Sequence, residues 1–357
     1  MVRSYLLKYI ILFIIIVIII FSTGCSKHQT QPVIDPESVE NPEDSIEDPV
    51  KNAEEPVIIN PVICPLGGEI IEKSQIENKR AIAVMIDNHP KARPQSGLAD
   101  AEVVYELPVE GGITRFLAIF LHNQALEIGP VRSARHYYLD LVMEYNAIYA
   151  YFGGSPQAWE QIPKLKIEGM NGIHDGATFY RYSGRKEPHD KYTSIERIRN
   201  TAKRRGYDGE KEMRKFYFNE EDMIPSDRPA KKVTIIYPPV KYTITYEFDP
   251  VQKVYLRYIE NNPHLDANNN KQIQAKNIII QSVNAKVIDS EGRLDIQMVG
   301  KGKGYYISNG CFKEISWQKD TRRSPTRFLD KDNSELKLNT GNTWVHLVPQ
   351  DSKIDFE

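Results

Sequence analysis

The sequence has 357 residues and a formal net charge of −2. This length is enough for two domains with hydrophobic cores of their own. The near-neutral charge gives no support for a nucleic-acid-binding protein, and three cysteines among scattered histidines do not form a zinc-binding pattern. We therefore expect no cofactor, no metal and no nucleic-acid partner.

Residues 1–24 are typical of the signal peptide of a bacterial lipoprotein. Arg3 and Lys8 precede an apolar run from Ile10 to Phe21, which leads through Ser22-Thr23-Gly24 to Cys25. The run is shorter than the roughly 20 apolar residues that span a bilayer. We expect cleavage before Cys25 and a diacylglycerol and palmitate anchor there, on the outer face of the cytoplasmic membrane. The alternative is an uncleaved N-terminal anchor with an incidental cysteine, which would also place the rest of the chain outside.

Residues 25–60 are predicted to be a disordered tether, because they are acidic and rich in proline. Nine acidic residues stand against two lysines. A segment of this composition cannot bury enough apolar surface to offset the entropy lost on ordering. The signal contributes +2 and the tether −7, so residues 61–357 carry +3 and are mildly basic.

Cys64 and Cys311 are the two cysteines that remain beyond Cys25. Outside the cytoplasm they can form a disulfide that joins the start of the folded region to its C-terminal part. Two unpaired thiols are the alternative, and the sequence does not decide between them.

Residues 61–206 alternate strand-like and helix-like segments, which predicts a layered, mixed α/β domain. Strands are predicted at 81–86, 103–105, 113–121 and 147–152. Helices are predicted at 131–145, from Pro156 onward with Ser155 as the N-cap, and at 194–205 before Gly206. In the helix 131–145 we expect a buried stripe of Ala134, Tyr138, Leu141 and Tyr145, and a solvent-facing side of Arg132, His136, Asp140 and Glu144.

A charged, irregular linker is predicted at 207–229, and residues 230–357 are predicted to be a β-rich domain. Short strands are expected at 233–237, 242–248, 254–259, 277–283, 294–299, 305–308, 312–317 and 343–348. Residues 266–270 are predicted to be a hairpin tip, and Gly300–Gly304 a flexible basic turn. The predicted fold class is α+β, with a mixed α/β N-terminal domain followed by a mostly β C-terminal domain.

Four arginines near loop or helix starts suggest an anion site. Arg132 and Arg135 are placed in the first turn of the predicted helix 131–145, where the macrodipole disfavours a positive charge. A bound phosphate or carboxylate, with Ser133 and free backbone N–H groups as further donors, would account for them. The alternative is a structural network, in which Glu106 and Glu110 pair with these arginines.

Two His-Asp dipeptides, His174-Asp175 and His189-Asp190, are candidates for metal or acid–base chemistry. Adjacent side chains of an extended segment point to opposite sides, so such a dipeptide is not a ready chelate. A loop-bracing histidine is the simpler interpretation of His189. Gly153-Gly154-Ser155-Pro156 lacks the lysine of a phosphate-binding loop and is explained by a tight turn with an N-cap.

Several of these segments together resemble the YerB-like lipoproteins, an uncharacterised bacterial family. The likeness rests on the segments 93–106, 110–116, 129–135 and 153–156 and on Pro188-His189, and it extends over about residues 65 to 350. It implies a signal, a spacer, an N-terminal domain of mixed α and β structure and a β-rich C-terminal domain. Many relatives have a histidine where this chain has Tyr151. The family has no established reaction.

The first functional hypothesis is a non-enzymatic binding or scaffold protein at the cell envelope. It would hold an anionic envelope ligand, or dock a cell-wall synthesis protein, through an arginine-rich face. The predicted ligand-binding residues are Arg93, Gln95, Glu106, Glu110, Thr114, Arg115, Arg132, Ser133, Arg135 and His189. The alternative is a hydrolase or transferase acting on envelope glycans, with Glu106 or Glu110 as the carboxylate and His189 or Asp190 as its partner.

Overall fold

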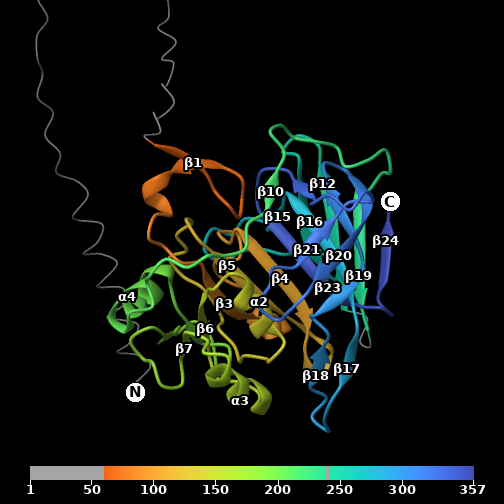
Figure 1. Cartoon of the computed structure of the whole chain (residues 1–357). Coiled ribbons are helices and arrows are strands. Elements are labelled where there is room, and N and C mark those ends of the chain that lie inside the picture. Colours follow the sequence, from red (N-terminus) through yellow and green to blue (C-terminus); the bar gives the residue numbers. More distant parts are fainter. Residues whose placement is uncertain (1–59, 239–241) are drawn as a thin grey trace, which may run out of the picture. The chain divides into compact units, whose positions relative to one another are not determined.

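A ten-stranded mixed sheet organises the part of the chain that the structure describes, residues 60–238 and 242–357 of a computed structural model (Figure 1). The signal 1–24, Cys25 and the tether up to residue 59 lie outside the described residues. From one edge to the other, the strands are β21 (Arg327–Leu329), β20 (Cys311–Lys319), β19 (Gly300–Ser308), β16 (Asn277–Val283), β23 (Thr343–Pro349), β4 (Val103–Pro108), β5 (Thr114–Phe120), β3 (Ile82–Asp87), β6 (Ile148–Tyr151) and β7 (Gly169–Asn171).

Strands from both predicted domains form this sheet. β16, β23, β4, β3, β6 and β7 run in the same direction, and β23 pairs with β4 in a parallel register that sets Trp344 opposite Val104. The segments 61–206 and 230–357 therefore meet at the centre of one sheet. They belong to a single compact unit that extends from Pro56 to Glu357.

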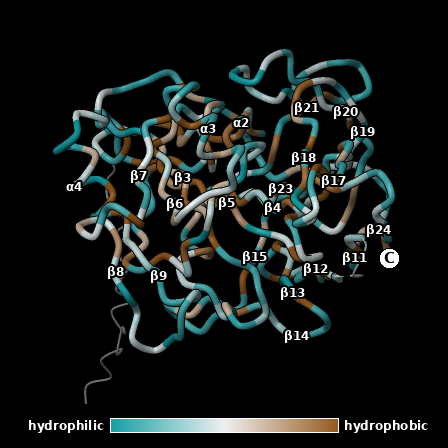
Figure 2. The backbone as a smooth tube through the Cα atoms, turned by 90° about the horizontal axis from the view of Figure 1, so that it is seen from below, coloured by the Kyte–Doolittle hydropathy of each residue, from teal (hydrophilic) through white to brown (hydrophobic). Residues whose placement is uncertain are grey.

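The two faces of the sheet bury two separate hydrophobic clusters. In β3, Ala83 and Met85 face α2 (Tyr138–Glu144) and α3 (Pro156–Lys164), whereas Ile82, Val84 and Ile86 face α4 (Ile195–Arg205) and a second sheet. Because side chains alternate along a strand, a strand covered on both faces becomes a continuous apolar run. Figure 2 shows hydrophobic segments concentrated in the interior and hydrophilic ones in the outer loops.

The second sheet has six strands and covers part of one face of the first. Its order is β14 (Asn262–Pro263), β13 (Val254–Ile259), β12 (Tyr242–Asp249), β11 (Lys232–Tyr237) and β24 (Lys353–Phe356), with β15 (Gln274–Ala275) also paired to β13. Two-stranded sheets complete the β structure: β1 (Pro61–Ile63) with β2 (Ile70–Glu72), β8 (Tyr180–Arg181) with β9 (Lys191–Tyr192), β10 (Tyr217–Phe218) with β22 (Lys337–Leu338), and β17 (Ala285–Val287) with β18 (Leu294–Ile296).

The described residues are thus mostly β, with three α-helices. Two of the three helices form as the sequence predicts. Ser155 caps α3, because its hydroxyl accepts the N–H of Ala158 at 3.2 Å, and Pro156 is the first helical residue. Ser194 caps α4 in the same way, and Gly206 ends it in the left-handed conformation with φ 67°.

The predicted helix 131–145 is wrong over its first half, since α2 begins at Tyr138. The preceding segment is extended and hydrogen-bonded to the ends of two strands. Asp87 N–H donates to Pro130 O at 2.9 Å, and Phe152 N–H donates to Arg132 O at 2.9 Å. These bonds to β3 and β6 replace helical ones, so Arg132 and Arg135 do not lie in a helix first turn.

The predicted solvent-facing side of that helix is also wrong, because Asp140 and Glu144 are buried. The Glu144 carboxylate accepts hydrogen bonds from Arg214 at 2.5 Å, from Lys319 at 2.7 Å and from Thr326 at 2.7 Å. Burial raises the pKa of Glu144. The two cations Arg214 and Lys319 lower it by a larger amount, so the pKa of Glu144 lies below its ordinary value. A carboxylate with two cations can be buried where an unpaired one cannot.

Three further predictions compare as follows. The predicted basic turn Gly300–Gly304 is wrong, because these residues are part of β19 and pair with β20. The predicted linker 207–229 contributes the buried Arg214 and strand β10. Cys64 and Cys311 are both free thiols, so no disulfide joins them.

Among the described residues, no helix is both long and apolar enough to span a bilayer.

A buried ion pair joins the two larger sheets. The guanidinium of Arg257 on β13 donates to Glu106 Oε2 on β4 at 2.8 Å, and neither side chain is exposed to solvent. Arg257 also donates to His264 Nδ1 at 2.9 Å and to Tyr246 OH at 3.0 Å, and its guanidinium lies 4.7 Å from the centroid of the Trp344 ring. Every donor group of this arginine that faces the interior has a partner, as burial of a charge requires.

Replacing Arg257 by Met should destabilise the protein by about 3–5 kcal/mol, because Glu106 would stay buried without its cation. Urea unfolding of residues 56–357 measures this. Arg228→Ala is the control: Arg228 pairs with Glu314 at the surface, and its loss should cost at most about 1 kcal/mol. Equal effects of the two substitutions would contradict a structural role of the buried pair.

Candidate functional site

The carboxyl edge of the parallel strands carries a group of polar side chains. After β3 the chain continues to β4, which lies beyond β5 on one side of β3. After β6 it passes through α3 to β7, which lies on the opposite side of β3. The point between β3 and β6 is therefore a topological switch point, where open α/β sheets commonly bind ligands. The extended segment 129–135 fills the gap between these two strand ends.

Four residues at this point form a cluster, which we call the His–Arg cluster: Asp87, His89, Arg132 and His189. Asp87 Oδ2 lies 2.8 Å from His189 Nδ1 and 3.0 Å from Arg132 Nε. The rings of His89 and His189 are stacked, with centroids 5.1 Å apart. Asp87 is fully buried, whereas a quarter of the Arg132 side chain is exposed.

The hydrogen bonds indicate how the two imidazoles are oriented. His89 Nδ1 accepts the N–H of Lys91 at 3.1 Å, which leaves Nε2 to carry the proton of a neutral ring. Burial lowers the pKa of His89, the nearby His189, Lys91 and Arg132 lower it further, and the carboxylate of Asp87 acts in the opposite direction. His189 turns Nδ1 to Asp87 and leaves Nε2 unpaired among the described residues. An imidazole held in this way can contact an anion or transfer a proton.

Of the four arginines in the predicted site, Arg132 has the fewest hydrogen bonds within the described part of the protein. Its contact with Asp87 is ionic, without the alignment of a hydrogen bond, and its one hydrogen bond to the described residues is a long one of 3.4 Å to Pro188 O. Ser133 follows it and is half-buried. A Cβ at Gly153 would lie 3.4 Å from Ser133 Oγ, so the glycine turn leaves space beside this hydroxyl.

The loop that follows β3 is fixed by a buried amide. Asn88 Nδ2 donates to Thr114 Oγ1 at 2.7 Å and to Tyr242 OH at 2.8 Å, and lies 3.3 Å from Glu106 Oε1. Its Oδ1 accepts from Arg93 at 3.1 Å and from Gln95 at 3.2 Å. Four predicted site residues thus belong to an internal network around Asn88: Arg93, Gln95, Glu106 and Thr114. This network fixes Asn88 and, with it, the two adjacent residues Asp87 and His89.

Arg115 and Arg135 enclose Glu110 in a second network. Arg135 Nε donates to Glu110 Oε2 at 2.9 Å, and Arg115 Nη2 lies 3.4 Å from Glu110 Oε1. Both arginines also point at the carbonyl of Ser133, at 2.9 Å for Arg115 and 3.5 Å for Arg135. Their donors are used to brace the segment 129–135, which corresponds to the structural network considered from the sequence.

The structure therefore divides the ten predicted ligand-binding residues. Arg132, Ser133 and His189 lie at the switch point, and the other seven belong to the two supporting networks described above. Asp87 and His89 complete the cluster and were missed, because the sequence shows Asp87-Asn88-His89-Pro90 only as a loop. Their place directly after a buried strand was the signal that pointed to a sheet edge.

The glutamates proposed for glycan hydrolysis pair with arginines, whereas their proposed partners His189 and Asp190 have ion pairs of their own. Glu106 is fully buried with Arg257, and His346 Nδ1 lies 3.6 Å from it. Burial and Arg257 lower the pKa of His346 well below its ordinary value, so this histidine is neutral. Glu110 is held by two arginines. In the described part of the chain both glutamates thus belong to salt-bridge networks, whereas glycoside hydrolysis requires two carboxyl groups at a suitable separation.

Glu110→Gln tests the second network through pH. Burial raises the pKa of Glu110, but Arg135 and Arg115 outweigh it and lower the pKa to about 2. The pair therefore contributes its full stability above the ordinary pKa of about 4.5 and loses it as the pH falls toward 2. At pH 7 the substitution should cost about 1–3 kcal/mol, since a quarter of the side chain is solvated.

Urea unfolding of the wild type and of Glu110→Gln between pH 7 and pH 3 measures this difference. The gap in free energy of unfolding should narrow as the pH decreases. A gap that stays constant over this range would show that the charge of Glu110 does not stabilise the network.

Comparisons with known proteins agree on one family. Residues 66–208 match the family described as "Protein of unknown function (DUF3048) N-terminal domain", and residues 233–345 match its C-terminal domain. The chain is 35% identical over 289 residues to "Putative lipoprotein YerB" of Bacillus subtilis (strain 168), which covers 80% of this chain and 86% of that protein. The crystal structure of YerB protein from Bacillus subtilis is similar with a TM-score of 0.74 and 32% identity, over 82% of this chain and 99% of that one.

Proposed function

The chain belongs to the YerB-like family of DUF3048 proteins, and on this premise we propose that it is a membrane-anchored lipoprotein that binds an anionic ligand of the cell envelope. The proposal has two parts, an anchor at Cys25 and a binding site at the His–Arg cluster. The name of the Bacillus subtilis relative supports the first part. The geometry at the switch point supports the second.

The anchor rests on the leader sequence. A basic start, an apolar run and Gly24 directly before Cys25 fit a lipoprotein signal, although Ser22 stands where such signals usually have Leu. Lipid on Cys25 would hold the protein at the outer face of the cytoplasmic membrane. The acidic tether would then separate the compact unit from anionic lipid headgroups.

Growth of cells that express the full chain with an alkyne-bearing fatty acid tests the anchor. The wild type should carry the label and fractionate with membranes, and Cys25→Ser should lose the label because Cys25 is the cysteine that directly follows the leader. Cys311→Ser is the matched control and should be labelled normally. An unlabelled wild type, or equal labelling of Cys25→Ser, would exclude lipidation at Cys25.

The binding site rests on Arg132. It is a partly exposed arginine beside two stacked histidines at a switch point, and it has the weakest internal hydrogen bonding of the four arginines. A guanidinium with free donors binds phosphate or carboxylate through charge-assisted hydrogen bonds. Ser133 Oγ and the Nε2 side of His189 supply further polar contacts. The ligand class is therefore an anion that carries phosphate or carboxylate groups.

Arg132→Ala should weaken binding of a phosphate-bearing ligand by about 10–100-fold, the loss expected for charge-assisted hydrogen bonds. Pyrophosphate and a soluble glycerol-phosphate oligomer are suitable probes, measured by calorimetry on residues 56–357. Arg228→Ala is the control. It removes a partly exposed arginine that is not part of the His–Arg cluster, and it should leave binding of both probes unchanged. A wild type that binds neither probe, or equal loss in both variants, would rule out this site.

A further inference from the structure

A second group of side chains lies near the opposite ends of the strands from the His–Arg cluster. β5 runs antiparallel to β3, so the last residue of β5, Phe120, pairs with the first residue of β3, Ile82. The β1–β2 hairpin turns between Cys64 and Glu69, where Cys64 N–H donates to Glu69 O at 2.8 Å and Gly68 N–H donates to Cys64 O at 2.9 Å. His122 follows the end of β5 and meets this turn. One ligand atom from each of Cys64, Glu69 and His122 lies within 4.8 Å of the other two.

The side chains in this turn are arranged toward one another. Cys64 is fully buried, and its Sγ lies 3.3 Å from His122 Nδ1. The Glu69 carboxylate folds back over Gly67, since a Cβ at Gly67 would lie only 2.1 Å from Glu69 Oε2. The absence of a side chain at Gly67 therefore admits this carboxylate to the turn.

Glu69 Oε2 is the unexplained atom of the group. It is buried and has no hydrogen-bond partner among the described residues. A buried carboxylate oxygen without a donor is costly, and a nearby cation removes that cost. A further negative charge is close: Glu102 Oε1 lies 2.9 Å from His122 Nδ1, and backbone N–H groups of residues 121–123 fix this carboxylate.

We propose that Cys64, Glu69 and His122 bind a divalent transition metal, with Zn²⁺ as the best match. A thiolate, an imidazole and a carboxylate are the donors that zinc prefers, whereas Ca²⁺ and Mg²⁺ require oxygen ligands. On binding, the ion displaces the thiol proton of Cys64 and the proton that His122 Nδ1 shares with Glu102, and both protons pass to solvent. Three protein ligands leave a fourth position for water or for a small ligand.

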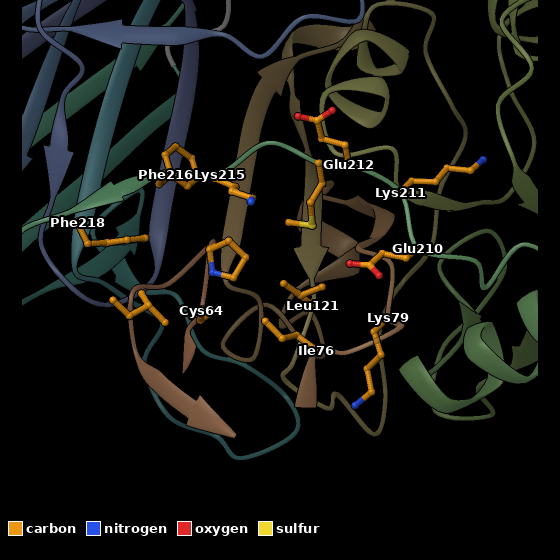
Figure 3. A pocket seen from close by; sticks show the side chains of 13 residues that line it. Cys64, Ile76, Lys79, Leu121, Glu210, Lys211, Glu212, Lys215, Phe216 and Phe218 are labelled. Carbon is orange, nitrogen blue, oxygen red and sulfur yellow. The ribbon is translucent and has the colours of Figure 1, made fainter. Parts of the chain in front are cut away.

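One of the three proposed ligands, Cys64, also lines a pocket. Cys64 lines a cavity of about 740 Å³, together with Pro65, Ile76, Leu121 and the segment 210–218. Figure 3 shows Cys64 near Leu121 and Ile76. Glu210, Lys211 and Lys215 belong to an irregular segment that also lines the pocket. An ion held by Cys64 would thus lie beside a space with an apolar wall and a charged rim.

The experiment uses residues 56–357, because this unit contains the whole site and lacks Cys25. After treatment with a chelator, calorimetric titration should show one Zn²⁺ bound per chain. Co²⁺ in place of Zn²⁺ should give a thiolate-to-metal charge-transfer band in the near ultraviolet. Cys64→Ser should abolish the band and weaken Zn²⁺ binding at least about 100-fold, and Glu69→Gln should weaken it about 10–100-fold.

Two matched controls separate this site from others. Cys311→Ser removes the other thiol, and Glu210→Gln removes a pocket carboxylate outside the three ligands. Both should bind Zn²⁺ as the wild type does. Circular dichroism checks that each variant is folded, and Glu69→Gln provides the test if Cys64→Ser is not.

Three outcomes would overturn the proposal. The wild type would bind no Zn²⁺ and give no charge-transfer band with Co²⁺, or folded Glu69→Gln would bind with unchanged affinity. Alternatively, His189→Ala would abolish Zn²⁺ binding while Cys64→Ser retained it, which would place the ion at the His–Arg cluster.

Discussion

The buried pair of Glu106 and Arg257 is the interaction on which the rest of the structure depends. It lies between the two larger sheets, and neither charge reaches solvent. Glu106 in turn contacts Asn88 and Thr114, so the same carboxylate orients the loop after β3. The position of Asp87 and His89 is therefore set from the interior: an ion pair that joins two sheets also fixes the start of the loop that carries the candidate site.

Most of the arginines that suggest a binding surface serve the backbone. Arg115 and Arg135 bind Glu110 and the carbonyl of Ser133, and Arg93 binds the carbonyl of Asn88 at 2.9 Å. An extended segment inserted between strand ends leaves carbonyl groups without sheet partners, and a guanidinium with several donors satisfies them well. What remains for a ligand is Arg132, with the two histidines beside it.

Local sequence rules predicted the elements whose ends depend on local interactions. The strand predicted at 81–86 is β3, and Ser155 caps α3 and Gly206 ends α4 as predicted. The start of α2 could not be predicted, because its preceding segment bonds to Asp87 and Phe152, far away in sequence. The burial of Glu144 depends on Lys319, which is 175 residues away. Likewise, Cys64 and His122 come together although they are 58 positions apart in the sequence, a spacing unlike that of the common zinc motifs.

The place of β23 has a consequence for biogenesis. This strand comes from the end of the chain, yet it sits in the middle of the large sheet, between β16 and β4. During synthesis, the edge of β4 that pairs with β23 stays open until residues 343–349 are available. An unpaired apolar edge invites aggregation, so the early part of the chain has to be kept from association while it waits for its partner strand. Closure of the large sheet therefore waits for residues 343–349, and a chain that stops before them leaves β16 and β4 without the strand that joins them.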